Sequence, residues 1–556
     1  MPSITINGCT VEFKPGQSIL QAALDHEMEI PHYCYHPGLS VVASCRICLA
    51  EVWAPNPKTQ KLEPFPKLVP TCQQPATEGM VVYSDSPKAV ANQKSVMELL
   101  LINHPVDCPV CDKAGECHLQ DYSYQYGRGV SRFEEDKIKQ PKKDIGPNVL
   151  LYSDRCIMCT RCVRFTREVS GTGELMVDGR GSTEQIDVFP GMALDNELSA
   201  NVTDICPVGA LLDKDFLFQQ RVWYLKRTPS IDGITASGDN IWVEHNEGHV
   251  YRVKPRANTD VNKWWITDEV RYGWKFVHRE DRLSMPTTKG ADPVDRTQAS
   301  DAWAAVSERI TEQMRSLGHV AHKRLALLVS PMLSCEDAFH LASYALAVDP
   351  TALLGVGPVP VNGTDKTFAG GFTLYGEKAP NARGVRRVLD ALAKAGGGKA
   401  KVEEFAGFVR EVSKPEFGAT IVTGNYPSEW ATPALVDALR HTFVVVIDTL
   451  PSKLSAVADA TLPSVTWTEK AGTFENAKGR LQVFRAAIPA KEFAKSEAQI
   501  AIDLLAEWQV RYPHAFDDAA TRAAMARVAG LEGIAQAHLP SSDHERVESD
   551  MVMVEL

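Results

Sequence analysis

Cysteine is almost absent from the second part of this chain of 556 residues. Only Cys335 occurs after residue 206, whereas the other twelve of the thirteen cysteines precede residue 207. The chain opens MPSITINGCT with no charged-then-apolar leader, so the crowded cysteines indicate metal ligation inside a cell or organelle and not a secreted disulfide framework. The two parts of the chain are therefore expected to carry different chemistry.

Other features are missing as well. No apolar run approaches the ~18 residues that a membrane-spanning helix needs, so any membrane attachment is expected to come through partners. The formal net charge of −11 argues against a nucleic-acid partner, because binding to phosphates requires a basic surface. Gly355-Val356-Gly357-Pro358 lacks the spacing of a dinucleotide loop, so only a turn is predicted there. The length predicts about three or four globular domains.

The first segment is predicted to form a hairpin followed by a helix. An Asn-Gly pair at residues 7–8 favours a tight turn between two short strands, and an apolar stripe predicts a helix over residues 18–29. Cys9 alternates in phase with Val11 and Phe13 on the return strand, which predicts a core position for Cys9.

Four cysteines with the spacing C-x10-C-x2-C-x23-C follow this helix: Cys34, Cys45, Cys48 and Cys72. Their order resembles the plant-type ferredoxin layout, in which a loop wraps a [2Fe-2S] cluster and the last ligand returns from a later strand. A zinc ribbon is the alternative, but zinc sites usually pair two short C-x2-C knuckles. Ser44 and Arg46 are expected to offer hydrogen bonds and positive charge to the cluster, and residues 54–70 are predicted to form a loop.

The second ligand set lies in the stretch HPVDCPVCDKAGEC and has the spacing H-x3-C-x2-C-x5-C: His104, Cys108, Cys111 and Cys117. A helix predicted from Ser86-Pro87 to residue 103 delivers the histidine. The C-x2-C pair directs two thiolates into one volume, and the flanking ligands can close a four-coordinate site. Free buried cysteines beside a surface histidine are the alternative, which the ligand sets on both sides disfavour.

The third ligand set is a C-x2-C-x2-C run whose proline-followed fourth cysteine comes after 43 intervening residues: Cys156, Cys159, Cys162 and Cys206. This is the bacterial ferredoxin run with its fourth ligand displaced. Because the chain has only one copy of the motif, Cys206 most simply completes the same [4Fe-4S] cluster. A structural zinc ion is the alternative.

The remaining chain changes character at about residue 221. Short alternating strands with turn signals at residues 237–240 and 246–248 predict a small β-rich unit up to residue 274, and a linker is predicted over residues 285–296. Beyond the linker, helical stretches separate three apolar runs that fit buried parallel strands, at residues 325–329, 420–422 and 443–447.

This second part also contains a lone cysteine, a run of glycines and a polar tail. Cys335 follows the possible N-cap Ser334 and is interpreted as a structural thiol, because Glu336 and Asp337 oppose the thiolate. The glycines at 396–398 indicate a hinge or insertion point, and the polar tail at 541–556 is predicted to be loose.

With all three ligand sets in order, the chain resembles the large iron–sulfur subunit of respiratory complex I, the NADH-quinone oxidoreductase. The resemblance covers residues 1 to about 275, including RTPSIDGITASGDNIWVEHNEGHVYRVKPR, and a looser likeness to molybdopterin oxidoreductases centres on GTFENAKGRLQ. It implies that the first set holds one [2Fe-2S] cluster and that the second and third sets hold one [4Fe-4S] cluster each. Some members carry a further four-cysteine set, which is missing here because no cysteine lies between Cys206 and Cys335.

The resemblance implies an α+β multidomain fold. Three domains would bind clusters: a β-grasp [2Fe-2S] ferredoxin-type domain (residues 1–84), a His/Cys3 [4Fe-4S] domain (85–125) and a [4Fe-4S] ferredoxin-like domain (145–220). They would be followed by a β-rich domain without a cluster (221–280) and an α/β molybdopterin-oxidoreductase-like domain (281–556). It also implies partners that bind flavin and NADH or lead toward quinone, and a peripheral place on the cytoplasmic side of the bacterial inner membrane or the mitochondrial matrix side. No molybdenum and no catalytic residue are expected on this chain.

Competing functions remain at this point. An iron-only hydrogenase shares the front ligand sets but needs more downstream cysteines than Cys335, and a molybdenum formate dehydrogenase needs the missing fourth cluster. An electron-transfer subunit of a soluble NAD-linked hydrogenase usually lacks so long a carboxy-terminal region. The last 280 residues or so are interpreted as a scaffold derived from a cofactor domain.

Overall fold

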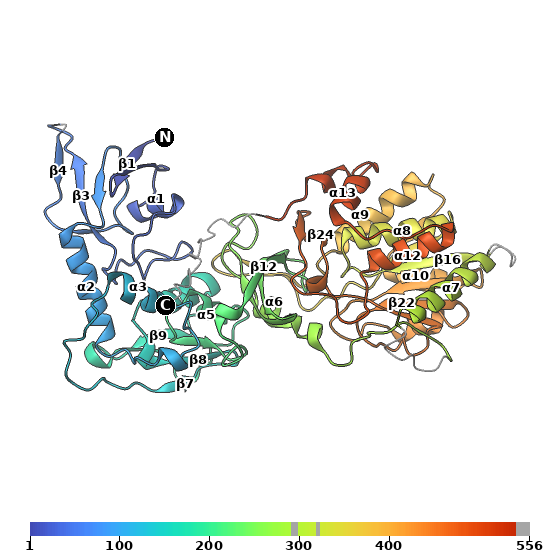
Figure 1. Cartoon of the computed structure of the whole chain (residues 1–556), viewed down its shortest axis with the longest axis horizontal. Helices are drawn as coiled ribbons and strands as arrows, with labels where there is room; N and C mark the ends of the chain where they lie inside the picture. Colours follow the sequence, from blue (N-terminus) through green and yellow to red (C-terminus); the bar gives the residue numbers. More distant parts are fainter. Residues whose placement is uncertain (60, 291–298, 318–322, 541–556) are drawn as a thin grey trace. The chain divides into compact units, whose positions relative to one another are not determined.

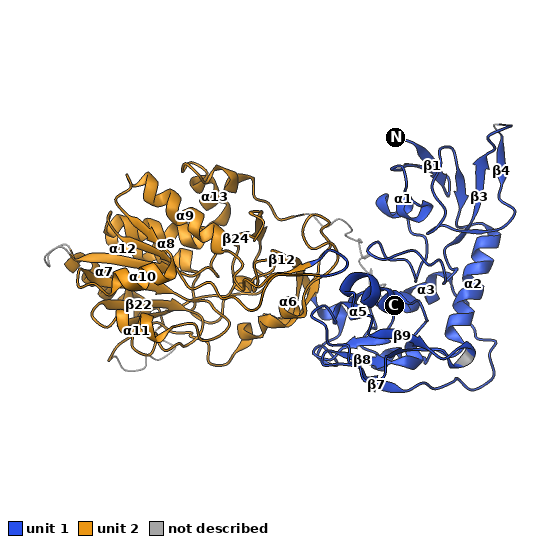
Figure 2. Cartoon of the chain, turned by 180° about the vertical axis from the view of Figure 1, so that it is seen from behind, with its two compact units in different colours: residues 1–225, 368–372, 543–556 blue, residues 226–367, 373–542 orange. Residues whose placement is uncertain are grey.

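The computed structural model describes the chain except for residues 60, 291–298, 318–322 and 541–556 (Figure 1). The described residues form two compact units, which Figure 2 colours separately. Unit 1 contains residues 1–225 and 368–372, and unit 2 contains residues 226–367 and 373–540. Every predicted ligand therefore lies in unit 1.

Unit 1 begins with a mixed sheet in the order β2-β1-β6-β3-β4, with β5 also paired to β3. The strands are β1 (Ser3–Ile6), β2 (Cys9–Glu12), β3 (Leu49–Pro55), β4 (Leu62–Pro64), β5 (Val69–Pro70) and β6 (Val81–Tyr83). The hairpin of β1 and β2 pairs with antiparallel register, and β1 runs parallel to β6. Apolar residues of helix α1 (Ile19–Asp25) share one core with the sheet. This arrangement fits the predicted ferredoxin-type domain.

Three local predictions for this sheet need correction. Cys9 is exposed and not part of the core, because it lies at the turn end of the edge strand β2. The helix ends at Asp25 instead of residue 29, since Glu27 adopts a left-handed φ of 57° that a helix cannot continue. The predicted loop over residues 54–70 contains β4 and β5, which extend the pairing of β3.

The rest of unit 1 is built from short elements around the second and third ligand sets. They are α2 (Pro87–Leu101), the 3-10 turn η1 (Cys108–Val110), α3 (His118–Tyr126), β7 (Lys142–Asp144), β8 (Val149–Tyr152), α4 (Arg161–Phe165), β9 (Leu175–Asp178), β10 (Gln185–Val188), α5 (Asn201–Ile205) and β11 (Leu211–Asp213). The predicted helix start is confirmed, because the side chain of Ser86 caps α2 by accepting from the N–H of Ala89. The polar, aromatic sequence of α3 carries no clear helical pattern, so this helix is a finding of the structure alone.

Unit 2 opens with a three-stranded antiparallel sheet of β12 (Lys226–Ile231), β13 (Asn240–Asn246) and β14 (His249–Pro255). This sheet confirms the start of the predicted β-rich unit, but its strands end at residue 255 and not at residue 274. Both turn signals are confirmed, because they fall between consecutive strands. Helix α6 (Asp268–Tyr272) follows the sheet and packs on the core that the strands share with Trp467 and Phe474.

The larger part of unit 2 is a sheet in the order β15-β23-β22-β21-β16-β17-β20, parallel except for β15. Its strands are β15 (Thr287–Thr288), β16 (Arg324–Val329), β17 (Leu353–Val356), β20 (Lys401–Glu403), β21 (Phe417–Thr423), β22 (Phe443–Asp448) and β23 (Ala460–Pro463). The predicted buried strands are confirmed. The order reverses between β16 and β21, as in doubly wound nucleotide-binding folds.

Helices cover both faces of this sheet. Leu325, Leu327 and Val329 share a core with α7 (Ala299–Leu317), α8 (Cys335–Val348), α9 (Ala382–Ala395) and α12 (Glu497–Gln509). The alternate residues Ala326 and Leu328 share the opposite core with α10 (Phe405–Val412) and α11 (Pro433–Ala438). Helix α13 (Asp518–Met525) adds Met525 to the first core. Burial on both faces explains why the strands are apolar throughout.

The smaller predictions for this region have mixed outcomes. Cys335 begins α8 and is fully buried, as expected for a structural thiol. The predicted turn at 355–358 is wrong in its first half, because Gly355 lies inside β17, where an added Cβ would stand 2.4 Å from the Phe408 ring. The glycines at 396–398 directly follow α9. Half of the predicted linker and the whole tail at 541–556 lie outside the described residues.

Candidate metal centres

The structure brings the four cysteines of the first set together within unit 1. The Sγ atoms of Cys48 and Cys72 are 3.6 Å apart, and the Cys34 thiol interacts with those of Cys45 and Cys72. Three of the four side chains are at most 2% exposed. Left-handed backbone at Ala43 (φ 51°) and Arg46 (φ 58°) turns the loop tightly on both sides of Cys45.

The surroundings of this set favour thiolates at some positions and thiols at others. A hydrogen bond with Cys72 lowers the pKa of Cys48 to about 7, although burial opposes this. The pKa of Cys34 falls because of hydrogen bonds from Cys45 and Cys72, with a smaller contribution from the predicted donor Ser44. Such donors stabilise the anionic sulfur that metal ligation requires.

The four cysteines of the third set line one buried pocket together with apolar residues that include Leu151 and Ile186. Cys206 therefore joins Cys156, Cys159 and Cys162 despite the long separation in sequence. Burial raises the pKa of Cys159 to about 11, while the guanidinium groups of Arg161 and Arg164 act in the opposite direction. Metal binding at such a site has to displace thiol protons.

The loop between the first cysteines of this set is shaped to point sulfur atoms inward. Met158 and Thr160 adopt left-handed φ values of 53° and 57°. This conformation lets the N–H of Met158 approach the Sγ of Cys156 to 3.4 Å. Backbone donors to ligating sulfur are one way in which a protein adjusts a cluster's potential.

In the second set, the environment of His104 fits a ligand. The residue follows α2, and burial lowers its pKa to about 4, so the ring is neutral at pH 7. The ring forms a hydrogen bond with the backbone of Arg155, and within the described residues its buried Nδ1 has no partner. A ligating histidine commonly uses one nitrogen for a backbone carbonyl and the other for the metal.

One cysteine of this set, Cys111, lies against the segment that follows Cys206. Cys111 and Cys117 are each 8% exposed, and burial raises the pKa of Cys117 to about 12. A Cβ added at Gly209 would stand 2.4 Å from the Sγ of Cys111. Gly209 therefore has to be glycine for the chain after Cys206 to pass this thiol.

Direct hydrogen bonds connect the third set to both of the others. Nη2 of Arg164 donates to the carbonyl oxygen of Cys34 at 2.6 Å and to that of Cys159 at 3.2 Å. On the other side, Lys113 donates to the carbonyl oxygen of Thr203 at 3.1 Å. These contacts connect the third set to the first set and to the second set within unit 1.

Within the residues that the structure describes, no three His, Cys, Asp or Glu side chains converge on a point suited to a single metal ion. The grouping of the sulfur atoms, the partnerless His104 nitrogen and the close approach at Gly209 are the observations that fit clusters.

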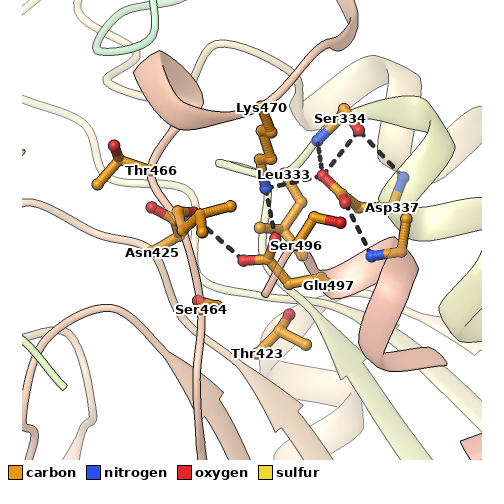
Figure 3. Close-up of polar contacts among 12 residues, drawn as sticks. Leu333, Ser334, Asp337, Thr423, Asn425, Ser464, Thr466, Lys470, Ser496 and Glu497 are labelled. Carbon is orange, nitrogen blue, oxygen red and sulfur yellow. Dashed lines mark hydrogen bonds and ion pairs between the residues drawn. The ribbon is translucent and has the colours of Figure 1, made fainter. Parts of the chain in front are cut away.

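Unit 2 has a separate buried polar cluster at the carboxyl edge of its sheet (Figure 3). The Lys470 ammonium lies 2.8 Å from Asp337, at the start of α8, and forms a second ion pair with Glu497, at the start of α12. Asn425, two residues after β21, donates to Glu497 at 3.0 Å. Ligands of doubly wound sheets bind at this edge, where the strand order reverses. In this chain, the ion pairs of Lys470 with Asp337 and Glu497 lie at this edge of the sheet.

Sequence reasoning missed the arginines at the ligand sets. Arg161 stands inside the C-x2-C-x2-C run and Arg164 stands two residues after its last cysteine, so their proximity to cysteine ligands is a usable signal. Their partners Tyr35 and Cys34 are more than 120 positions away in sequence, and no local pattern indicates that contact. Arg46, which was expected to supply charge, is exposed.

Family models match most of the chain. Unit 1 matches three: a 2Fe-2S iron-sulfur cluster binding domain, the NADH-ubiquinone oxidoreductase-G iron-sulfur binding region and the ferredoxin-like domain of NADH-quinone oxidoreductase subunit 3, at residues 2–87, 93–132 and 146–212. Residues 225–275 match the NDSU1/NuoG-like 4Fe-4S domain, although this stretch contains no cysteine. Residues 381–507 match molybdopterin oxidoreductase. The class is thus a multidomain iron–sulfur protein with a molybdopterin-oxidoreductase-type domain.

Curated relatives give the particular likeness. The chain is 35% identical over 341 residues to a subunit of the NADH-quinone oxidoreductase of Rickettsia felis, covering 61% of this chain and 48% of that protein. It is 44% identical over 308 residues to the mitochondrial NADH dehydrogenase [ubiquinone] iron-sulfur protein 1 of Solanum tuberosum, covering 55% and 40%. The predicted resemblance to the large iron–sulfur subunit of complex I is confirmed. The chain spans about half the length of the curated relatives it matches.

A solved structure is also similar in sequence. A chain in the crystal structure of an NAD+-reducing [NiFe]-hydrogenase in the H2-reduced state is 30% identical, with 40% of this chain and 91% of that chain covered. The TM-score is 0.34. None of the described helices of the present chain is both long and apolar enough to cross a membrane.

Proposed function

We propose that the chain is an iron–sulfur electron-transfer subunit of NADH-quinone oxidoreductase. It carries electrons from a flavin-bearing subunit toward quinone in a proton-translocating respiratory complex. The chain is thus part of an enzyme without having a substrate site of its own. The similarity to the iron–sulfur subunits of this oxidoreductase supports the function.

The observation that carries the proposal is the hydrogen-bonded connection of the three ligand sets inside unit 1. Arg164 bridges the backbones of Cys34 and Cys159, and Lys113 in the second set bonds to Thr203, three residues before Cys206. A protein that only stored metal would have no need to hold three sets in one contiguous body. We infer an electron relay that uses all three sets.

Each ligand set is proposed to hold one cluster. The first set holds a [2Fe-2S] cluster and the others hold [4Fe-4S] clusters, with His104 as the one imidazole ligand; molybdenum is not part of the proposal. When bound, the clusters supply reversible one-electron chemistry. The chain supplies ligands, backbone and guanidinium donors, and apolar walls that keep water away from the sulfur atoms.

The proposed partners are the other peripheral subunits of the complex, including the flavin- and NADH-binding subunit and the iron–sulfur subunits on the quinone side. With them the chain would sit peripherally on the cytoplasmic side of the bacterial inner membrane or the matrix side of the mitochondrial one. Unit 2 is proposed to be a scaffold, because the paired charges of Lys470 lie where a cofactor would bind.

Reduction of the full chain by two donors tests this function. The chain reconstituted anaerobically with iron and sulfide should be reduced by dithionite and not by NADH, because it has no dinucleotide fingerprint. Addition of a flavin-bearing partner subunit should make NADH effective. Rapid bleaching by NADH without any flavoprotein would contradict the proposal, as would a reconstituted chain that dithionite cannot reduce.

A further inference from the structure

Two arginines of the third ligand set are buried between that set and the first. Arg161 begins α4 and Arg164 lies one turn later, so both side chains leave the same side of the helix. Each side chain belongs to a residue that is only 6% exposed. Arginine is rarely buried to this extent unless a negative charge compensates its own.

The hydrogen bonds of both guanidinium groups reach across the two sets. Besides bridging Cys34 and Cys159, Arg164 donates from Nη1 to the carbonyl oxygen of Ser40 at 2.5 Å. Arg161 donates to the carbonyl oxygen of Tyr35 at 2.5 Å and to that of Ile205 at 3.1 Å. The chain beside Cys34 and the chain beside Cys206 are thus both held by an arginine.

The acceptors of Arg164 are neutral carbonyl groups. Within the described part of the chain, Arg164 has no ion pair, and its buried Nε has no hydrogen-bond partner. A buried charge without a counter-charge is unfavourable, because desolvation is not repaid. The groups that can repay it are the anionic thiolates of the two ligand sets that it bridges.

We propose that Arg164, assisted by Arg161, is a positioning residue that the first-set and third-set clusters share. The positive charge of Arg164 raises the reduction potentials of both clusters. The inference rests on the proposed function. Reduction adds a negative charge to a cluster, and a nearby buried cation favours that state. The second-set cluster, which Arg164 does not contact, should be affected much less.

A potentiometric titration followed by low-temperature EPR tests the proposal on the full reconstituted chain. Arg164→Met removes the charge at similar length, and Arg132→Met is the matched control, because Arg132 is 66% exposed and pairs with Glu98 at the surface. At the wild-type midpoint potential, the ratio of reduced to oxidised cluster should be about tenfold lower in Arg164→Met than in the wild type, for both bridged clusters. This ratio corresponds to a midpoint potential lower by ~59 mV for a one-electron couple. The control should leave all three midpoints unchanged.

Different results would overturn the proposal. Arg164→Met with intact clusters and unchanged midpoints contradicts it, and so does an equal shift of all three clusters. If Arg164→Met does not assemble its clusters, Arg164→Lys is the deciding variant, because lysine keeps the positive charge but cannot bridge two carbonyl groups with a guanidinium fork. Midpoint potentials near those of the wild type would support a role of the charge. A full shift of the midpoints would contradict that role. Absence of EPR signals in the reduced wild-type chain would instead contradict the proposed function.

Discussion

The backbone N–H of His118 donates to the carbonyl oxygen of Pro207 over 3.0 Å. His118 directly follows the last ligand of the second set, and Pro207 directly follows the last ligand of the third. This single bond therefore joins the ends of two ligand sets whose sequences are almost ninety positions apart. The segment that begins at Pro207 then passes Cys111 at Gly209.

Replacing Gly209 with alanine should damage the second set selectively. The new Cβ would stand 2.4 Å from the Sγ of Cys111, so either the thiol or the backbone has to move. We expect Gly209→Ala to lose about four irons per chain, the content of one tetranuclear cluster, and to keep the other two EPR signals. Gly129→Ala is the control, because its Cβ would meet nothing within 4 Å. Full iron content in Gly209→Ala would show that this passage is not tight.

His104 should behave as a ligand when it is exchanged. His104→Ala removes the partnerless imidazole nitrogen, so one tetranuclear EPR signal should change or disappear while the other two clusters persist. His26→Ala provides the histidine control in unit 1, because the His26 ring contacts the carbonyl oxygen of Ala22 and no ligand set. Three unchanged signals in His104→Ala would remove His104 from the ligand set.

Lys470 should stabilise unit 2 and not a metal site. Lys470→Met leaves Asp337 and Glu497 buried without their counter-charge, which should lower the free energy of unfolding by about 3–5 kcal/mol. Denaturant unfolding followed by tryptophan fluorescence measures the loss. Arg440→Met, which breaks an exposed pair with Asp437, should cost less than ~1 kcal/mol. Equal effects of the two substitutions would mean that the buried ion pairs contribute no more than a surface pair.

The stability of unit 2 should depend on pH through His340. Burial lowers the pKa of His340 from 6.5 to about 4. The Asp337 carboxylate opposes this shift of the pKa, and His514 adds to it. Nε2 of His340 lies 3.0 Å from the hydroxyl oxygen of Thr521. Because the folded state disfavours the charged ring, this contribution is fully present above pH 6.5 and is lost as the pH falls toward 4.

The matching variant isolates that contribution. His340→Asn should lose less stability than the wild type between pH 7 and pH 4, by up to about 3 kcal/mol, at 1.36 kcal/mol per pKa unit. Unfolding curves at a series of pH values give the difference. Parallel pH profiles for the two proteins would contradict the assignment to His340.

The ligand sets could be predicted because short spacing makes them local. Met158 and Thr160 allow three cysteines of a C-x2-C-x2-C run to face one pocket whatever the rest of the fold does. Cys206 was predictable only from the proline that follows it. Cys9 shows the limit of predictions from alternation. The alternating pattern predicts which face of the strand Cys9 lies on, but it does not predict whether other residues cover that end of the strand.

The contacts between elements could not be predicted in the same way. The bridge from Arg164 to Cys34 spans 130 positions, and the strand order of unit 2 depends on which helices pack on which face. The short strands β4 and β5 are held by pairing with β3 and have little propensity of their own. Such features follow from tertiary packing, which overrides local preference.

The metal and sulfide content of the chain tests the proposed set of three clusters most directly. Eleven of the thirteen cysteines are assigned to clusters, leaving the exposed Cys9 and the buried Cys335. Anaerobically reconstituted protein should contain about ten irons and about ten acid-labile sulfides per chain, with neither molybdenum nor stoichiometric zinc. About fourteen irons would reveal an additional cluster, bound molybdenum would favour a formate dehydrogenase, and zinc in place of iron would contradict the electron relay.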